Sequence, residues 1–262
     1  MPIFLQTLRE SWRGILFWAV ALVIVMTLYL SFYSSMGQTA GLDLFMAQLP
    51  EGMANAFGFQ DIGSGAGWAQ STFFGLLGLF LLAAAGVVWG TRAIAGDEEA
   101  GMLELTLAHS VSRTQVYGER LLALVTQIAL LGLAVAAALM LLDSPAELGL
   151  DFANVPPQML AYLGVGFLCA VLAFAVGATT GRRSLAISFG GGLAVAAFLL
   201  NALGNVSEDN EWMHVVSPVS WAYQNRPLMN GWDLEGLALL YGVSLVLVVL
   251  GLVGFLRRDV TA

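Results

Sequence analysis

The sequence contains no lysine, a single cysteine and only two histidines among its 262 residues. Without lysine it cannot contain the Gly-Lys-Ser/Thr end of a phosphate-binding P-loop, so it cannot hydrolyse ATP by that route. One cysteine excludes a disulfide within the chain, and Cys169, in an apolar run, is expected to be a small buried group. Charged residues make up only 11% of the chain, which excludes an ordinary soluble domain.

Long apolar runs take the place of the missing charges. Hydrophobic residues form 58% of the chain and the mean hydropathy is +0.81. Six runs reach the roughly 20 residues that a helix needs to cross a hydrocarbon core: 14–34, 71–91, 121–142, 158–180, 184–205 and 236–256. None of them contains Asp, Glu, Arg or His. We therefore predict an all-α polytopic membrane protein with six transmembrane helices, in a single transmembrane domain that covers residues 1–262.

The distribution of arginine predicts the orientation in the membrane. All ten basic residues are arginine, and nine of them fall on one side of the predicted spans: Arg9, Arg13, Arg92, Arg113, Arg120, Arg182, Arg183, Arg257 and Arg258. By the positive-inside rule that side is cytoplasmic, so both termini are cytoplasmic. The opposite side carries Arg226 against eleven carboxylates. This balance offers no basic groove, so we expect no binding of nucleic acid.

The residues before the first span have a helical pattern. Phe4, Leu8 and Trp12 recur at four-residue spacing, and polar side chains such as Arg9 and Glu10 occupy the other face. The pattern predicts an N-terminal interfacial helix that lies along the inner membrane surface before the chain turns into the first span. An ordinary charged flank with an aromatic anchor fits the same residues.

Two outer connections are too structured in composition to be plain loops. Residues 35–70 contain an amphipathic stretch before Pro50 and a glycine-rich part near Gly63, which we expect to be a flexible exit. Residues 206–235 mix aromatic side chains with Pro218 and Pro227. We interpret them as short helices that dip back into the outer leaflet, with a simple interfacial cap as the alternative.

Small and polar residues inside the spans indicate how the helices meet. Gly86 and Gly90 have the four-residue spacing of small residues at a close helix contact. Thr126, Gln127 and Asn201 are the candidate pathway residues, because they are polar groups in otherwise apolar helices. Hydrogen bonding between helices is the role we favour for them over contact with a transported substrate.

The connection between the second and third spans, residues 92–120, is the most informative segment. Gly96 is expected to end the second helix, and Asp97 to begin a new one of about three turns. Ser112 and Gln115 have capping-box spacing, which predicts that a further helix begins at Ser112 and continues into the third span. A short helix of this kind is marginal by itself, so it must pack on the membrane surface or on a cytosolic protein.

Residues 95–113 read A-G-D-E-E-A-G-M-L-E-L-T-L-A-H-S-V-S-R. This string resembles the cytoplasmic signature of type-2 ABC transporter permeases, commonly E-E-x-G-T-L-E-L-L-L-A-x-P-V-S-R. The predicted topology, the stretch from Ser217 to Gly231 and the ending at residues 255–259 are similar to exporter-like members of that family. Met102 departs from the usual Thr, and His109-Ser110 stands where Pro is common.

The resemblance implies a type V exporter-like permease subunit of a prokaryotic plasma membrane that works as a dimer, with itself as the expected second copy. Two copies of a separate ABC ATPase would dock beneath it and bind ATP and Mg, so this chain would carry no cofactor, metal or catalytic residue. The cytoplasmic coupling helix between spans 2 and 3 would contact that ATPase. Its predicted coupling residues are Asp97, Glu98, Glu99, Gly101, Met102, Leu103, Glu104, Leu105, Leu107 and Arg113. Because the spans are apolar and uncharged, we expect export of an amphipathic or hydrophobic compound, such as a drug, an antibiotic or a lipid-like molecule.

Two other classes of function compete with this interpretation. An ion-coupled carrier ordinarily places ionisable side chains within its spans, and the predicted spans have none. An intramembrane hydrolase would need Ser64 with His214, or Glu98 and Glu99 with a histidine. Neither spacing places a nucleophile beside a base or supplies three metal ligands. Membrane lipid is the remaining expected partner.

Overall fold

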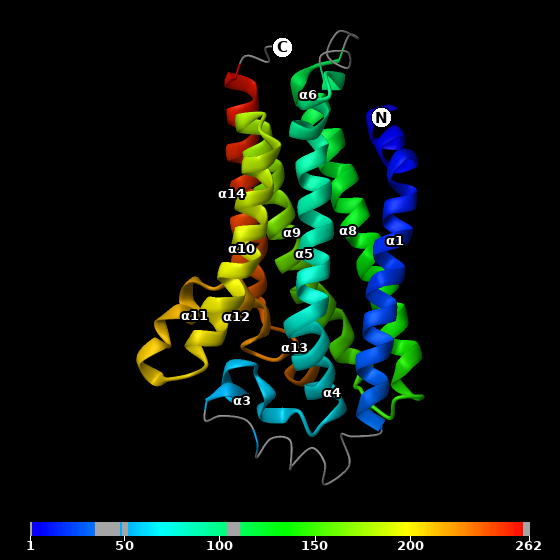
Figure 1. Cartoon of the computed structure of the whole chain (residues 1–262), viewed down its shortest axis with the longest axis vertical. Helices are drawn as coiled ribbons and strands as arrows, with labels where there is room; N and C mark the ends of the chain where they lie inside the picture. The colour runs from blue at the N-terminus through cyan, green and yellow to red at the C-terminus, as the bar shows by residue number, and fades with distance from the viewer. Residues whose placement is uncertain (1, 35–47, 49–51, 104–110, 259–262) are drawn as a thin grey trace.

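The computed structural model describes residues 2–34, 48, 52–103 and 111–258. Within these residues the chain is helical, and six helices are long and apolar enough to cross a membrane. They run alongside one another in Figure 1 and span Ile3–Phe32, Gly65–Glu99, Arg113–Asp143, Phe152–Thr180, Arg183–Gly204 and Leu234–Arg257. The predicted all-helical membrane fold and its six spans are confirmed. Five of the helices are longer than the predicted apolar run, because residues at their ends continue the backbone hydrogen bonding, and Arg183–Gly204 agrees with its prediction to within one residue.

The two ends of the bundle differ. Helix α1 (Pro2–Phe32) begins and α14 (Leu234–Arg257) finishes at the same end, beside α6 (Asp97–Glu99) (Figure 1). We call this the arginine-rich end, because it receives the nine arginines predicted on one side. The short helices α3 (Met53–Ala56), α4 (Gly65–Trp68), α11 (Trp212–Val216), α12 (Pro218–Tyr223) and α13 (Pro227–Asn230) gather at the opposite, loop-rich end.

Helix α9 (Val155–Thr180) forms the centre of the bundle and packs against α5 (Gly78–Thr91), α8 (Arg113–Asp143), α10 (Arg183–Gly204) and α14. In its most apolar stretch 72% of the residues are buried, against 17% in α1 and 22% in both α10 and α14. The contact with α5 confirms the predicted role of Gly86 and Gly90. A Cβ at Gly90 would lie 2.3 Å from the Ala170 carbonyl oxygen, so only glycine permits this approach.

Helix α1 corrects the prediction of a separate interfacial helix. It is continuous from Pro2 to Phe32, with no turn between the flank and the first span. The flank packs on α8, where the backbone N–H of Phe4 donates to Glu119 Oε2 at 3.0 Å. This bond supplies a partner for one of the backbone N–H groups that the first turn of a helix leaves without a hydrogen bond. In addition, α1 contains no proline after Pro2 that would break it. The side chains of Phe4 and Trp12 therefore belong to the first membrane helix.

The second membrane helix also ends later than predicted. It passes through η3 (Ala69–Leu77), α5 and the π-helical η4 (Arg92–Gly96) into α6 without interruption. Gly96 has an ordinary right-handed conformation, so it does not break the helix. The chain turns at Gly101, whose φ of 70° is left-handed and favours glycine. The expected single helix from Asp97 is thus divided at residue 101.

Helix α8 begins as predicted. The Ser112 side chain accepts the backbone N–H of Gln115 at 3.2 Å and caps the helix. The Gln115 side chain donates to Glu119 Oε1 at 2.9 Å, so it does not complete the reciprocal half of the capping box. The Gln115–Glu119 bond keeps Glu119 facing the start of α1.

The loop-rich end confirms one expectation and corrects another. Residues 206–235 form short helices, as predicted, and α12 buries Pro218 and Val219. The glycine-rich stretch is not a flexible exit: Ser64 caps α4, and a Cβ at Gly65 would lie 2.1 Å from the Leu148 carbonyl oxygen. The amphipathic stretch expected before Pro50 lies outside the described residues, except for residue 48.

Candidate functional site

Three consecutive carboxylates at the end of the second membrane helix each bind a different part of the bundle. Asp97 Oδ2 lies 2.7 Å from Arg120 Nη2 of α8. Glu98 Oε2 lies 2.5 Å from Arg258 Nη2, directly after α14. Glu99 Oε1 accepts the backbone N–H of Arg183, the first residue of α10, at 3.0 Å. We call Asp97, Glu98 and Glu99 the carboxylate triplet; it connects the second membrane helix to α8, α10 and α14.

Arginine side chains reinforce these connections. The Arg120 side chain is 5% exposed and also donates to the Ala93 carbonyl, so it holds α8 against η4. Arg113, at the start of α8, donates to the carbonyls of Phe255 and Arg258. Charge-assisted hydrogen bonds are stronger than neutral ones, so residues 97–99 are held firmly to three other helices.

The remaining predicted coupling residues follow the turn at Gly101. Met102 is 51% exposed, whereas Leu103 is fully buried, so these neighbours point to opposite sides. Glu104, Leu105 and Leu107 lie outside the described residues. Arg258 links two of the predicted residues, because its side chain pairs with Glu98 and its carbonyl accepts a hydrogen bond from Arg113. The Met102 side chain lies at the surface of the arginine-rich end.

The three candidate pathway residues do not share one site. Thr126 Oγ1 donates to the Leu122 carbonyl within its own helix at 2.8 Å. Gln127 is buried and lines a small cavity at the arginine-rich end. Asn201 lies near the loop-rich end, where its Oδ1 accepts the Ser220 hydroxyl at 2.9 Å. Gln127 and Asn201 therefore line different cavities, at opposite ends of the bundle.

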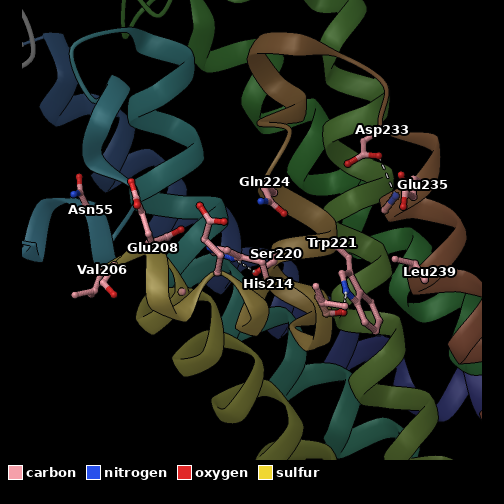
Figure 2. Close-up of a pocket in the computed structure, with 16 residues that line it drawn as sticks. Asn55, Val206, Glu208, His214, Ser220, Trp221, Gln224, Asp233, Glu235 and Leu239 are labelled. Carbon is pink, nitrogen blue, oxygen red and sulfur yellow. Dashed lines mark hydrogen bonds between the residues drawn. The ribbon is translucent and has the colours of Figure 1, made fainter.

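An open cavity of about 750 Å³ occupies the loop-rich end, between α10, α11, α12 and the start of α14 (Figure 2). His214 Nδ1 lies 2.8 Å from Ser220 Oγ, and the hydroxyl of Ser220 in turn donates to Asn201. Four acidic residues line the same cavity: Glu208, Glu211, Asp233 and Glu235. The cavity is therefore polar and acidic, and it lies at the opposite end of the bundle from the carboxylate triplet.

This geometry bears on the hydrolase alternative. The single hydroxyl proton of Ser220 is directed at Asn201, whereas a nucleophilic serine must give its proton to a base. Ser64, the serine considered from the sequence, bonds the Asp61 carbonyl and caps α4, so it is not paired with His214. Glu98 and Glu99 are engaged on α6, which lies at the opposite end of the bundle from α11, the helix that carries His214 (Figure 1).

A second cavity at the loop-rich end, of about 250 Å³, adjoins the first and contains polar groups that sequence reasoning missed. Gln70 Oε1 accepts the backbone N–H of Leu228 at 3.2 Å, while its Nε2 has no partner among the described residues. The buried Tyr223 hydroxyl is also unpartnered there, and burial raises the pKa of this phenol well above its ordinary value. Arg226 pairs with Asp61 across the cavity. A glutamine next to an apolar run was the only sequence signal for this site.

The comparison with known proteins agrees with this architecture. Residues 5–256 match the family model described as multidrug efflux system permease Rv1217c, C-terminal domain. The chain belongs to this family. No curated protein matches it. The family and the six apolar helices together identify a multi-pass membrane permease of a multidrug efflux system, a transporter component.

Proposed function

We propose that this permease is the membrane-spanning subunit of an ATP-driven ABC exporter. In this proposal residues 1–262 act as one permease domain, with both termini in the cytoplasm of a prokaryote. It works as a dimer, with a second copy of itself as the expected partner. Two copies of a separate ATPase subunit bind ATP and Mg beneath the arginine-rich end. The need for a separate ATPase agrees with the absence of lysine, because this chain cannot form a P-loop.

The carboxylate triplet is the observation that carries the proposal. A motor that pushes on residues 97–113 must move several membrane helices together if it is to open a pathway. Asp97 and Glu98 each form a short ion pair to another helix or its end, and Glu99 holds the start of α10. These bonds supply such a connection between the cytoplasmic segment and the bundle. Glu98 and Glu99 therefore act inside the permease, and the exposed Met102, together with the predicted coupling residues that follow it in the sequence, contacts the ATPase.

The cargo we propose is an amphipathic or hydrophobic compound that leaves toward the loop-rich end. The family description names multidrug efflux, and the described membrane helices place mostly apolar side chains in the bundle. Transport assays with reconstituted permease and ATPase, across a series of compounds of graded polarity, test this point. Preference for strongly hydrophilic compounds contradicts it.

Site-specific cross-linking tests the ATPase contact. With the buried Cys169 replaced by alanine, one variant carries Met102→Cys at the arginine-rich end. The matched control carries Val215→Cys, which is 73% exposed at the loop-rich end. We expect a short cross-linker in native membranes to join position 102, and not position 215, to a P-loop ATPase. Recovery of an ATPase adduct only at position 215, or at neither position, contradicts the proposal.

A double and a single substitution compare loss of the ATPase contact with loss of the Glu98–Arg258 bond alone. Glu98→Arg with Glu104→Arg should uncouple or dissociate the ATPase while the permease still inserts in the membrane. Glu98→Gln alone should weaken the bond to Arg258 and reduce transport, with the ATPase still bound. If ATPase binding is unchanged in the double variant, the contact lies elsewhere on the permease.

A further inference from the structure

A groove at the arginine-rich end borders Asp97 and Met102, but its Thr91, Arg92 and Arg183 side chains have no part in the proposed coupling. It has a volume of about 560 Å³ and lies between the start of α1, the end of α5 and the start of α10. In Figure 1 these helices stand side by side, with α5 between α10 and α1. The size is within the range of small-ligand sites, which is roughly 300–1,000 Å³.

Two arginines line this groove with their guanidinium groups uncommitted. No hydrogen bond or ion pair to the Arg92 or Arg183 side chain is formed within the described part of the chain; Arg183 takes part only through its backbone N–H. Arg120 also reaches the groove but is paired with Asp97. Glu10 accepts a hydrogen bond from Gln6 at 2.9 Å. The lining therefore carries three arginines against two carboxylates, Glu10 and Asp97, and the guanidinium groups of Arg92 and Arg183 are the ones left to bind an anion.

A buried threonine also lines the groove. Thr91 lines it and is only 2% exposed, yet its Oγ1 has no hydrogen-bond partner among the described residues. A threonine in a helix commonly bonds the carbonyl one turn earlier. Buried hydroxyl groups are rarely left unpaired, because the lost hydrogen bond costs free energy. A hydroxyl group and two guanidinium groups that line one groove are the kinds of donor that bind an oxyanion.

The wall below the arginines is apolar. Val88 lies one helical turn before Arg92, and Ile187 lies one turn after Arg183, both toward the middle of the bundle. Their side chains are 48% and 43% exposed, so they are open to whatever occupies the groove. The groove therefore has a cationic end at the level of the helix ends and an apolar end within the membrane. A soluble anion would use only the first of these; a phospholipid uses both.

We propose that this groove binds the phosphate group of an anionic phospholipid of the adjacent leaflet, with Arg92, Arg183 and Thr91 at the phosphate and an acyl chain along Val88 and Ile187. The lipid would stand between α1 and α10, where the helices leave α5 uncovered. This inference needs only the membrane location of the permease and is independent of the ATPase.

Native mass spectrometry of the full-length permease tests the site. The protein is titrated with phosphatidylglycerol or with phosphatidylcholine of the same acyl chains. We expect wild type to retain the anionic lipid in preference to the zwitterionic one. Arg92→Gln with Arg183→Gln should weaken that binding roughly 30-fold, since two basic side chains near an anionic lipid are removed. Thr91→Val keeps the charge and shape and should weaken it about tenfold through the lost hydrogen bond.

The matched control removes the same charge from the same end. Arg182→Gln with Arg257→Gln changes two exposed arginines that do not line the groove, and we expect it to retain wild-type lipid binding. An equal loss in this control would show nonspecific attraction and overturn the proposal. So would equal binding of the two lipids by wild type. Displacement of phosphatidylglycerol by excess inorganic phosphate would assign the groove to a soluble anion instead of a lipid.

Discussion

The substitution Gly90→Ala tests the central contact of the bundle. Gly90 on α5 faces the backbone of α9, where an added Cβ would lie 2.3 Å from the Ala170 carbonyl oxygen and 3.3 Å from the Phe174 nitrogen. Both neighbours are backbone atoms, so no side-chain rotation relieves the overlap. Ordinary carbon–oxygen contact needs about an ångström more, and α5 must therefore move away from α9.

The expected magnitude follows from two opposing effects. Alanine is favoured over glycine in a helix by roughly 0.5–1 kcal/mol. Inserting a methyl group into a close-packed contact costs about 1–3 kcal/mol. The neighbouring Gly86 and Ala170 lose contacts as the helices separate, because a Cβ at Gly86 would already lie 2.9 Å from Ala170 Cβ. We expect a net destabilisation of about 1–2 kcal/mol for Gly90→Ala.

Gly192→Ala is the matched control, because an added Cβ at Gly192 meets no atom within 4 Å. It should raise the free energy of unfolding by between zero and about 1 kcal/mol, because alanine is the better helix former. The assay is unfolding in mixed micelles with an increasing mole fraction of sodium dodecyl sulfate, followed by circular dichroism. If Gly90→Ala is as stable as Gly192→Ala, the α5–α9 contact does not have the close packing described here.

Two further predictions concern the arginine-rich end. A double-mutant cycle with Glu98→Gln and Arg258→Gln should give a coupling energy of about 1 kcal/mol. The value is modest because the two side chains are 16% and 19% exposed, so solvent screens the pair. Additive effects of the two substitutions would mean that the ion pair does not form. Ser112→Ala should lower stability by about 1 kcal/mol by leaving the Gln115 N–H without its cap, and Ser112→Asp should retain it. Hydrogen exchange at the first turn of α8 measures this effect, and equal protection in the two variants would contradict it.

The sequence alone predicted the class of protein, the number of membrane helices and one helix cap. Uncharged runs of about 20 residues specify membrane helices because an ionised side chain within hydrocarbon is costly. Ser112 was predictable for a different reason, since a cap depends only on residues within one turn. The continuous start of α1 was not predictable, because it depends on the bond from Phe4 to the distant Glu119. The turn at Gly101 was not predictable either, because glycine at position 96 is compatible with a helix and does not end it there.

Only the tertiary structure decided which polar residues meet. Asp97 pairs with Arg120, and Glu98 with Arg258, which is 160 residues away along the chain. The helices that carry these residues are apolar nearly all round, so their patterns do not reveal which faces touch. Close approach at glycines such as Gly90 sets those faces, and hence places Arg92 and Thr91 at a groove that no local motif indicates. Local signals determine that helices form; packing between distant helices determines which side chains become a site.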